Sequence, residues 1–300
     1  MRKLDLYQDR HIAKHLDETE PDEEGYFDMG SGRVRDVAIS FATFAAGVAI
    51  VILMWQALAL YGNAFLGLSM AFPTPADSFG RLWEWLSQDA NLFGHSLTEH
   101  VLASLKRWFV AFALAALTGV ALGSLLGYFD KFYSVGIVPV TVLQTIPGLA
   151  WIPIAILLFG IGDESAIFII YMVSSMVITI NVAGGIRMVP DTVLRAGGMM
   201  GAGNLVVFLK ILIPYATVDI INGLRVGMGS AWRVLIAAEM LVGSGIGLGA
   251  SIELLRCILD YVGAFACIVI ICAIGLLMDK VVFTGIEKYA RHKLGMEEGY

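Results

Sequence analysis

Long uncharged stretches of apolar residues alternate with short polar segments along most of this 300-residue chain. An α-helix rises about 1.5 Å per residue, so roughly 20 apolar residues are needed to cross a hydrocarbon core of ~30 Å. The apolar stretches are long enough, and the pattern predicts an all-α polytopic membrane protein with about six transmembrane helices. The predicted spans lie near residues 37–60, 108–129, 132–161, 166–186, 211–240 and 261–284.

Two of these spans are predicted to be irregular. The third contains Pro139, Pro147 and Pro153, and a proline in a helix removes a backbone hydrogen bond, so we expect one long, kinked helix. The fifth has charged residues and glycines within an apolar sequence, which predicts a broken helix.

Composition supports a membrane protein. The chain is 58% hydrophobic and 15% charged, whereas soluble domains have about 45–50% apolar and about 25% charged residues. The net charge of −6 arises largely in the N-terminal tail, so it says little about partners, and no basic stripe points to nucleic acid. The pattern divides the chain into a charged cytoplasmic N-terminal tail (1–36), a transmembrane domain (37–286) and a cytoplasmic C-terminal tail (287–300). We interpret the first tail as solvated, with docking to a partner as the alternative.

The distribution of lysine and arginine predicts the orientation. With both termini in the cytoplasm, ten basic residues lie in inner segments near the spans and four in outer segments, which satisfies the positive-inside rule. The four outer residues are Arg81, Lys106, Arg107 and Arg256. This topology places the loop 187–210 in the cytoplasm.

Enzymatic motifs are missing from the sequence. No G-x-x-x-x-G-K-[ST] phosphate-binding loop and no G-x-S-x-G motif occur, and the segment HSLTEH does not have the spacing of a zinc-protease helix. We interpret His95 and His100 as exposed loop histidines, and the three cysteines as small apolar residues. The chain is therefore expected to be non-catalytic and to hold neither metal nor cofactor.

The loop segment RAGGMMGAGNLVVFLKILIP, residues 195–214, is polar and rich in glycine. It predicts a short helix, a turn at Gly201 and Gly203, a second short helix, and Pro214 in the first turn of the next span. Such an element forms a compact protrusion that suits a groove in another protein.

The spacing of this segment resembles the EAA loop of permease subunits in bacterial ABC importers. That loop reads E-A-A, three residues, G, nine residues, I-x-L-P. The matching positions here are Arg195, Ala196, Gly197, Gly201, Ile211, Ile213 and Pro214. Arg195 replaces the usual Glu, Gly197 the second Ala and Ile213 the Leu. Because the first change reverses a charge, an ion pair of the family's Glu with its ATPase does not carry over.

Further segments between about residues 73 and 294 resemble the nitrate/sulfonate/taurine/bicarbonate branch of these permeases. They are PTPADSFGRLWEW, IPGLAWIPIAILLFGIGDESAIF, GLRVGMGSAWRVLIAAEML and GSGIGLGASI. The resemblance implies the type I ABC importer permease fold in a bacterial inner membrane, with the loop 187–210 as the ATPase-coupling element. It also implies a homodimer, two cytoplasmic ATPase subunits that bind ATP and Mg²⁺, and an extracytoplasmic substrate-binding protein.

Polar residues inside the spans, together with a proline at a kink and one tryptophan, are candidates for the translocation path. A charged side chain in a bilayer costs at least about 2.5–3.5 kcal/mol on insertion scales, and it usually faces a cavity or a partner. The candidates are Gln144, Pro147, Trp151, Ser174, Ser175, Asn181, Arg225, Arg233 and Glu239. The alternatives are helix packing for the uncharged residues and a structural ion pair near the outer end for the charged ones.

The expected function is that of a permease subunit which moves a small anionic nutrient into the cytoplasm by alternating access. Nitrate, sulfonate, taurine and bicarbonate all remain open as substrates. One alternative is an ion-gradient-driven secondary transporter or channel. Another is an ABC permease for a different solute, such as methionine, a phosphonate or a pyrimidine precursor.

Overall fold

The computed structural model describes residues 29–65, 72–87 and 91–293. The chain divides into two compact units, Met1–Pro75 and Ala76–Tyr300, and each is described by itself. Residues 1–28 of the predicted N-terminal tail lie outside the described residues, but its last part, residues 29–36, is helical.

The described part of the first unit contains one long helix, α2 (Met29–Phe65). Its C-terminal part is tied to the segment that follows it. The indole Nε1 of Trp55 donates a hydrogen bond to the carbonyl oxygen of Pro73 at 2.9 Å. The side chain of Asn63 pairs with both backbone polar groups of Phe72, at 2.6 and 3.1 Å. These bonds satisfy polar backbone groups next to the end of an apolar helix.

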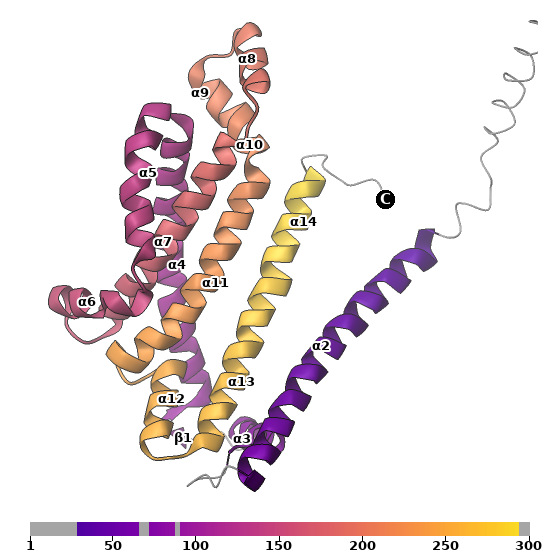
Figure 1. Cartoon of the computed structure of the whole chain (residues 1–300), viewed down its shortest axis with the longest axis vertical. Helices are drawn as coiled ribbons and strands as arrows, with labels where there is room; N and C mark the ends of the chain where they lie inside the picture. The colour runs from indigo at the N-terminus through magenta and orange to yellow at the C-terminus, as the bar shows by residue number, and fades with distance from the viewer. Residues whose placement is uncertain (1–28, 66–71, 88–90, 294–300) are drawn as a thin grey trace, which may run out of the picture. The chain divides into compact units, whose positions relative to one another are not determined.

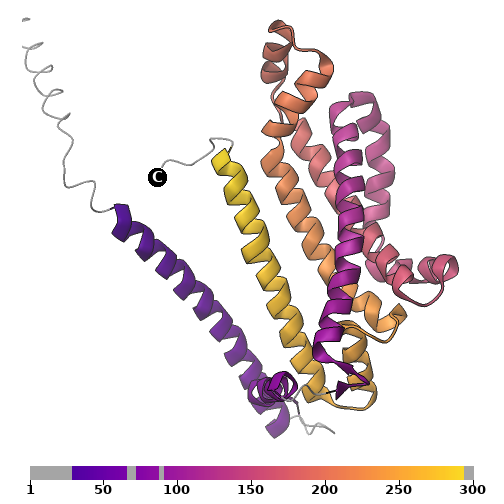
Figure 2. The same cartoon turned by 180° about the vertical axis from the view of Figure 1, so that it is seen from behind.

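The second unit is almost entirely helical (Figures 1 and 2). Its α-helices are α3 (Pro75–Ser87), α4 (Leu97–Tyr128), α5 (Asp130–Thr145), α6 (Ile152–Phe159), α7 (Asp163–Arg187), α8 (Asp191–Met199), α9 (Asn204–Val207), α10 (Ile213–Tyr215), α11 (Thr217–Val242), α12 (Leu248–Cys257), α13 (Tyr261–Leu277) and α14 (Thr284–Lys293). A 3₁₀ turn, η2 (Gly148–Trp151), and two π-helical segments, η3 (Phe208–Leu212) and η4 (Met278–Phe283), complete the helical set. Strands β1 (Asn91–Leu92) and β2 (His95–Ser96) form a short antiparallel hairpin.

Helices α4, α7 and α11 pack closely through small residues. Gly119, Gly123 and Gly127 recur every fourth residue on α4, which places them on one face against α7. A Cβ atom at Gly123 would lie only 2.7 Å from the carbonyl oxygen of Thr179. Because lipid tails are as apolar as leucine, close backbone approach through small residues is a major means of helix association in membranes.

This close packing makes a stability prediction. Gly123→Ala is expected to destabilise the purified protein by about 1–3 kcal/mol, because the added methyl group meets backbone that cannot give way cheaply. The matched control is Gly184→Ala on α7, where an added Cβ meets nothing within 4 Å. Thermal unfolding in detergent should show a lower midpoint for the first variant only, and equal midpoints would contradict the packing.

Four described helical segments are long and apolar enough to cross a membrane: Ile39–Phe65, Leu97–Tyr128, Asp163–Arg187 and Tyr261–Glu287. Two bent pairs, Asp130–Thr145 with Gly148–Phe159 and Asn204–Tyr215 with Thr217–Val242, raise the number to six if each pair is one span. The six predicted spans correspond to that upper number.

The third predicted span bends far more sharply than a proline kink. Its two halves meet at 97°. Pro139 lies inside α5, whereas Ile146 and Pro147 both leave the helical conformation, with ψ angles of 120° and 139°. The residue before a proline is disfavoured in the helical region, so Pro147 accounts for the extended conformation of Ile146. The sequence showed the prolines but not that one of them would end the helix.

The prediction that His100 lies in an exposed loop is wrong. The hairpin ends at Ser96, which caps α4 in a capping box with Glu99, so that His100 lies in the first turns of the helix. Its side chain is completely buried, and its Nε2 lies 3.1 Å from the carbonyl oxygen of Leu92.

Candidate functional site

The loop between α7 and α11 contains the predicted short helix and glycine turn. Helix α8 ends at Met199, and Gly201 adopts φ +80°. The amide of Gly201 donates to the carbonyl of Gly198 at 3.0 Å, and the amide of Ala202 donates to that of Gly197 at 3.1 Å. This pair of bonds is a Schellman motif, whose left-handed residue is usually glycine. The turn therefore requires the residue type found at position 201.

Gly197 has a separate role. A Cβ atom there would collide with Cδ1 of Ile211, so α8 rests directly on η3. Ala stands at this position of the EAA pattern, and Ile211 occupies another position of the same pattern. Two of the matched positions are thus in contact, while Arg195 and Ala196 are exposed.

Large apolar side chains cover the tip of this element. Met199, Met200 and Leu205 are 84%, 86% and 70% exposed, respectively. Helices α8 and α9 project beyond the ends of α5 and α7 in Figure 1. Arg195 lies on the same element, with its guanidinium 3.7 Å from the carboxylate of Asp191 and both side chains 79% exposed. An ion pair so exposed holds Arg195 only weakly.

The fifth predicted span begins later than the apolar pattern indicated. Helical residues Asn204–Tyr215 form one arm with a π-helical turn, and α11 starts at Thr217 after a bend of 63°. Pro214 lies in the last turn before this bend, rather than at the start of the span. Because proline has no amide hydrogen, the helix before it is already short of one hydrogen bond, which favours a break there.

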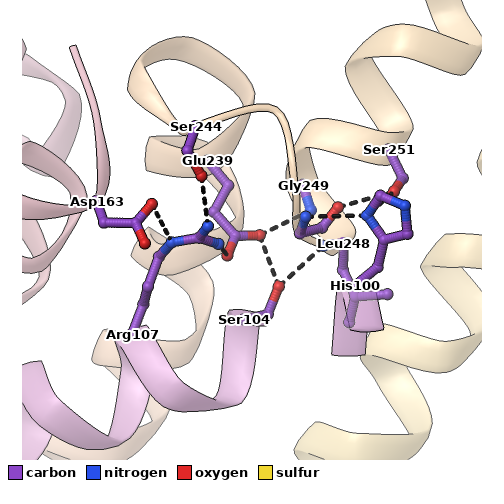
Figure 3. A network of polar contacts seen from close by, with 10 residues as sticks. His100, Ser104, Arg107, Asp163, Glu239, Ser244, Leu248, Gly249 and Ser251 are labelled. Atoms are coloured by element: carbon purple, nitrogen blue, oxygen red, sulfur yellow. Dashed lines mark hydrogen bonds and ion pairs between the residues drawn. The ribbon is translucent and has the colours of Figure 1, made fainter. Parts of the chain in front are cut away.

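A buried ion cluster (Figure 3) joins three helices on the α12 side of the unit, away from the α8–α9 element (Figure 1). Arg107 of α4 is 3% exposed, and its Nη1 lies 2.7 Å from Oε1 of Glu239 near the end of α11. Its Nε lies 2.8 Å from Oδ1 of Asp163, the first residue of α7. Its Nη2 donates to the hydroxyl of Ser244 at 2.8 Å. One guanidinium thus connects α4, α7 and α11.

Glu239 is fully satisfied within this cluster. Its side chain is 0% exposed, and Oε2 accepts hydrogen bonds from the hydroxyl of Ser104 at 2.8 Å and from the amide of Gly249 at 2.9 Å. A carboxylate that accepts several hydrogen bonds beside a guanidinium is compensated inside the chain. The geometry matches the structural ion pair that the sequence left open for Glu239.

The same cluster fixes the loop between α11 and α12. The amide of Leu248 donates to the hydroxyl of Ser104 at 2.8 Å, and that of Gly247 donates to Nδ1 of His100 at 3.0 Å. Because Nδ1 accepts, the proton of the neutral ring lies on Nε2, which faces the carbonyl of Leu92. Figure 3 shows these contacts converging on one face of α4.

Sequence reasoning missed this cluster, although a signal was present. His100, Ser104 and Arg107 stand at positions i, i+4 and i+7, which form one face of a helix. The count of basic residues places Arg107 in an outer segment and does not indicate its partners. A polar face at the start of an apolar span indicates that its side chains have buried polar partners. Glu239 is an acidic residue within a span that can pair with Arg107.

Arg225 is also neutralised within the chain. Its Nε lies 2.7 Å from Oδ1 of Asp279 in η4, and its Nη1 lies 3.3 Å from the carboxylate of Glu287 in α14. These ion pairs connect α11 to the C-terminal helices. The Arg225 side chain is 29% exposed and lines a cavity.

Arg233 is placed differently from the other charged candidates. Its side chain is exposed, and its guanidinium donates to the hydroxyl of Ser230 at 3.3 Å, without an ion pair to any acidic group among the described residues. It lies 16 residues into α11, about 24 Å along the helix at 1.5 Å per residue. It lines a cavity of about 550 Å³ together with Asn222, Arg225, Val226, Met228, Gly229, Trp232, Gly275 and Asp279.

The uncharged candidates separate into two groups. Ser174 and Ser175 are buried in α7, and Asn181 is half-buried there; each donates to a carbonyl of its own helix. Trp151 is buried, and its ring packs edge to face against that of Phe168, with 6.3 Å between the ring centroids. Gln144 in the last turn of α5 and Pro147 at the bend that follows are exposed. Of the uncharged candidates, only Gln144 and Pro147 therefore face outward from the unit.

The chain is similar to known transport proteins. The family described as "Binding-protein-dependent transport system inner membrane component" matches residues 119–283. An ABC transporter permease protein of Methanocaldococcus jannaschii is 37% identical over 65% of this chain and 73% of its own length. The nitrate import permease protein NrtB of a Synechocystis species is 34% identical over 68% of this chain and 73% of its own length. The taurine transport system permease protein TauC of Escherichia coli is 27% identical over 73% of this chain and 76% of its own length.

A solved structure shows the fold. An inward-facing form of the MetNI methionine ABC transporter contains a chain with a TM-score of 0.58 and 20% identity, covering 65% of this chain and 95% of its own. The fold is therefore that of a type I ABC importer permease, as the sequence predicted. The family match covers more than half of the chain. The chain belongs to the family of inner-membrane permease components of binding-protein-dependent ABC transport systems.

Proposed function

We propose that this chain is the permease subunit of an ATP-driven importer, and that it moves a small anion into the cytoplasm by alternating access. The observation that carries this proposal is the projecting α8–α9 element with its exposed apolar tip. Three large apolar side chains more than two-thirds exposed on one short loop are expensive in water and typical of a docking surface.

The partner of this element is a cytoplasmic ATPase subunit. Methionine side chains are flexible and polarisable, so Met199 and Met200 suit a groove that changes shape during a cycle. ATP and Mg²⁺ belong to that subunit, and closure of two such subunits would move the α8–α9 elements and the helices attached to them. Arg195 faces the same surface, where it fits an acidic position on the ATPase.

The rest of the assembly follows from the family. A second copy of the chain completes the path, and a binding protein delivers the substrate on the side of α12 and the β1–β2 hairpin. The count of basic residues supports this orientation, with both termini in the cytoplasm. The ion cluster around Arg107 then lies near the outer surface, where it holds α4, α7 and α11 together as one body.

Arg233 is the residue that we assign to the anion. Arg225 and Glu239 are compensated by partners in the chain, whereas Arg233 has a charge without an acidic partner in the described part of the span. A charge in that position is stabilised by water in a cavity or by a passing anion. Relatives named for nitrate import and taurine transport handle solutes with an oxoanion group, for which a guanidinium is well suited.

Replacing Arg233 tests this assignment. Arg233→Gln is expected to raise the KM for uptake of the anion by roughly tenfold or more, because a hydrogen bond to a charged group contributes about 1.5–3 kcal/mol. Arg233→Lys should keep most of the affinity, since the charge remains. Uptake into proteoliposomes at several substrate concentrations measures both variants. An unchanged KM in Arg233→Gln would remove this residue from the path.

Measurements of ATP hydrolysis test whether the ATPase activity belongs to the partner subunit and not to this chain. The purified chain alone is expected to hydrolyse no ATP, and the complex with its ATPase should hydrolyse ATP at a rate that the binding protein stimulates. ATP hydrolysis by the chain without a partner would contradict the proposal.

A further inference from the structure

Helix α3 has three distinct sides. Ser78, Leu82 and Trp85, at positions i, i+4 and i+7, face the interior, and Trp85 is only 7% exposed. The neighbouring side carries an exposed apolar set with the same spacing, namely Phe79, Trp83 and Leu86 at 43%, 72% and 62% exposure. The third side is polar, with Asp77, Gly80, Glu84 and Ser87.

The buried side fixes α3 at the end of a membrane span. Trp85 packs in a cluster with Leu97 of α4, Leu255 of α12 and residues of α13. Arg81 reaches from α3 to Asp260, with 2.7 Å between Nη1 and Oδ2. Asp260 is the N-cap residue of α13, where the apolar segment of that span begins. The helix is thus held at the level where hydrocarbon gives way to polar groups.

The direction of α3 agrees with this level. In Figures 1 and 2, α3 is seen nearly end-on, whereas α13 runs along the length of the picture. A helix that lies across a span at its end runs along the membrane surface. This end is opposite to the α8–α9 element.

We propose that α3 is an interfacial helix. Its exposed apolar side, formed by Phe79, Trp83 and Leu86, inserts into the lipid of the leaflet at which α13 begins. Three sides facing protein, lipid and water match the three surroundings of a helix in that position. Tryptophan and phenylalanine are favoured at the boundary of headgroups and acyl chains. The charged groups Asp77, Arg81 and Glu84 sum to one negative charge, so insertion is driven by apolar area rather than by attraction to anionic headgroups.

Spin-label accessibility tests this position in the intact transporter. In a background with Cys257→Ser, Cys267→Ala and Cys272→Ala, single cysteines are introduced as Phe79→Cys, Trp83→Cys and Leu86→Cys. The matched controls are Glu84→Cys and Ser87→Cys on the polar side. The labelled permease is reconstituted with its ATPase subunits in vesicles of phosphatidylcholine, and separately in vesicles of phosphatidylethanolamine and phosphatidylglycerol.

Labels on the apolar side are expected to collide more often with oxygen, which concentrates in the bilayer, than with a water-soluble nickel chelate. The two controls should show the reverse, and both lipid mixtures should give the same pattern. Greater nickel accessibility at all three apolar positions would place that side in water. Protection from both reagents would show that protein covers it, whether another part of this chain, a second copy or the binding protein. Either result would overturn the proposal, whereas the proposed transport function would stand.

Discussion

Gly201→Val is expected to reduce ATP-driven uptake by on the order of tenfold or more, while the protein still inserts into the membrane. Gly201 adopts φ +80° at the Schellman turn, and an added Cβ meets nothing within 4 Å. The substitution therefore causes no collision, and its cost arises in the backbone alone. A β-branched residue in this region is strained by about 1–3 kcal/mol, which corresponds to roughly 5–150-fold in an equilibrium. The turn should open and move α8 relative to α9.

Two variants separate this effect from a general loss of the loop. Gly203→Val introduces the same side chain two residues away, where φ is −68° and the space is also open, so it should retain coupled uptake. Gly201→Asn should retain most of it, because asparagine tolerates the left-handed conformation. The measurement is substrate moved per ATP hydrolysed in proteoliposomes. Normal coupling in Gly201→Val would show that the turn geometry has no part in docking.

Glu239→Ala is expected to destabilise the protein by about 3–5 kcal/mol, the largest effect on stability that the structure indicates. The substitution leaves the buried guanidinium of Arg107 with Asp163 as its acidic partner, and it removes the acceptor for Ser104 and for the amide of Gly249. A buried polar group without a hydrogen-bond partner destabilises the folded protein by the full cost of its desolvation. Thermal unfolding in detergent should show a much lower midpoint.

A matched control is available on α12. Glu253 also pairs with an arginine, Arg256, but this pair is partly exposed and lies outside the spans. The hydrogen bond from Arg256 lowers the pKa of the Glu253 carboxyl, yet Glu253→Ala should change the midpoint little because water screens such pairs. Equal midpoints for the two glutamate variants would contradict the structural role of Glu239. Combining Glu239→Leu with Arg107→Met should recover stability relative to Glu239→Ala, because no charge is then buried without a partner.

Local sequence patterns predicted much of the helical structure. Apolar length indicated the spans, and the spacing of Gly201 indicated the turn after α8, because both depend on residues close together in the chain. The pattern also showed that the third and fifth spans are irregular. It did not show that the chain turns by 97° around Ile146 and Pro147, because the direction of that turn also depends on how η2 packs against α7 and α11.

The pairing of charged residues could not be predicted from spacing alone. The arginine nearest to Glu239 in the sequence is Arg233, six residues away, but the ion-pair partner is Arg107, 132 residues away on another helix. The polar face of α4 indicates that Arg107 has buried partners, but which acid pairs with it depends on how α4 and α11 pack. Conversely, Arg233 is distinguished only by the absence of an acidic partner in the described spans, which a sequence cannot reveal.

Uptake of a labelled anion into proteoliposomes tests the central claim most directly. Vesicles contain the permease with or without its ATPase subunits. The binding protein is added on the side of the membrane where it docks to the permease. We predict that uptake requires the ATPase, ATP and Mg²⁺ together, and that it persists when ion gradients are collapsed. Uptake by the permease alone, driven by an ion gradient and independent of ATP, would contradict the account and favour a secondary transporter.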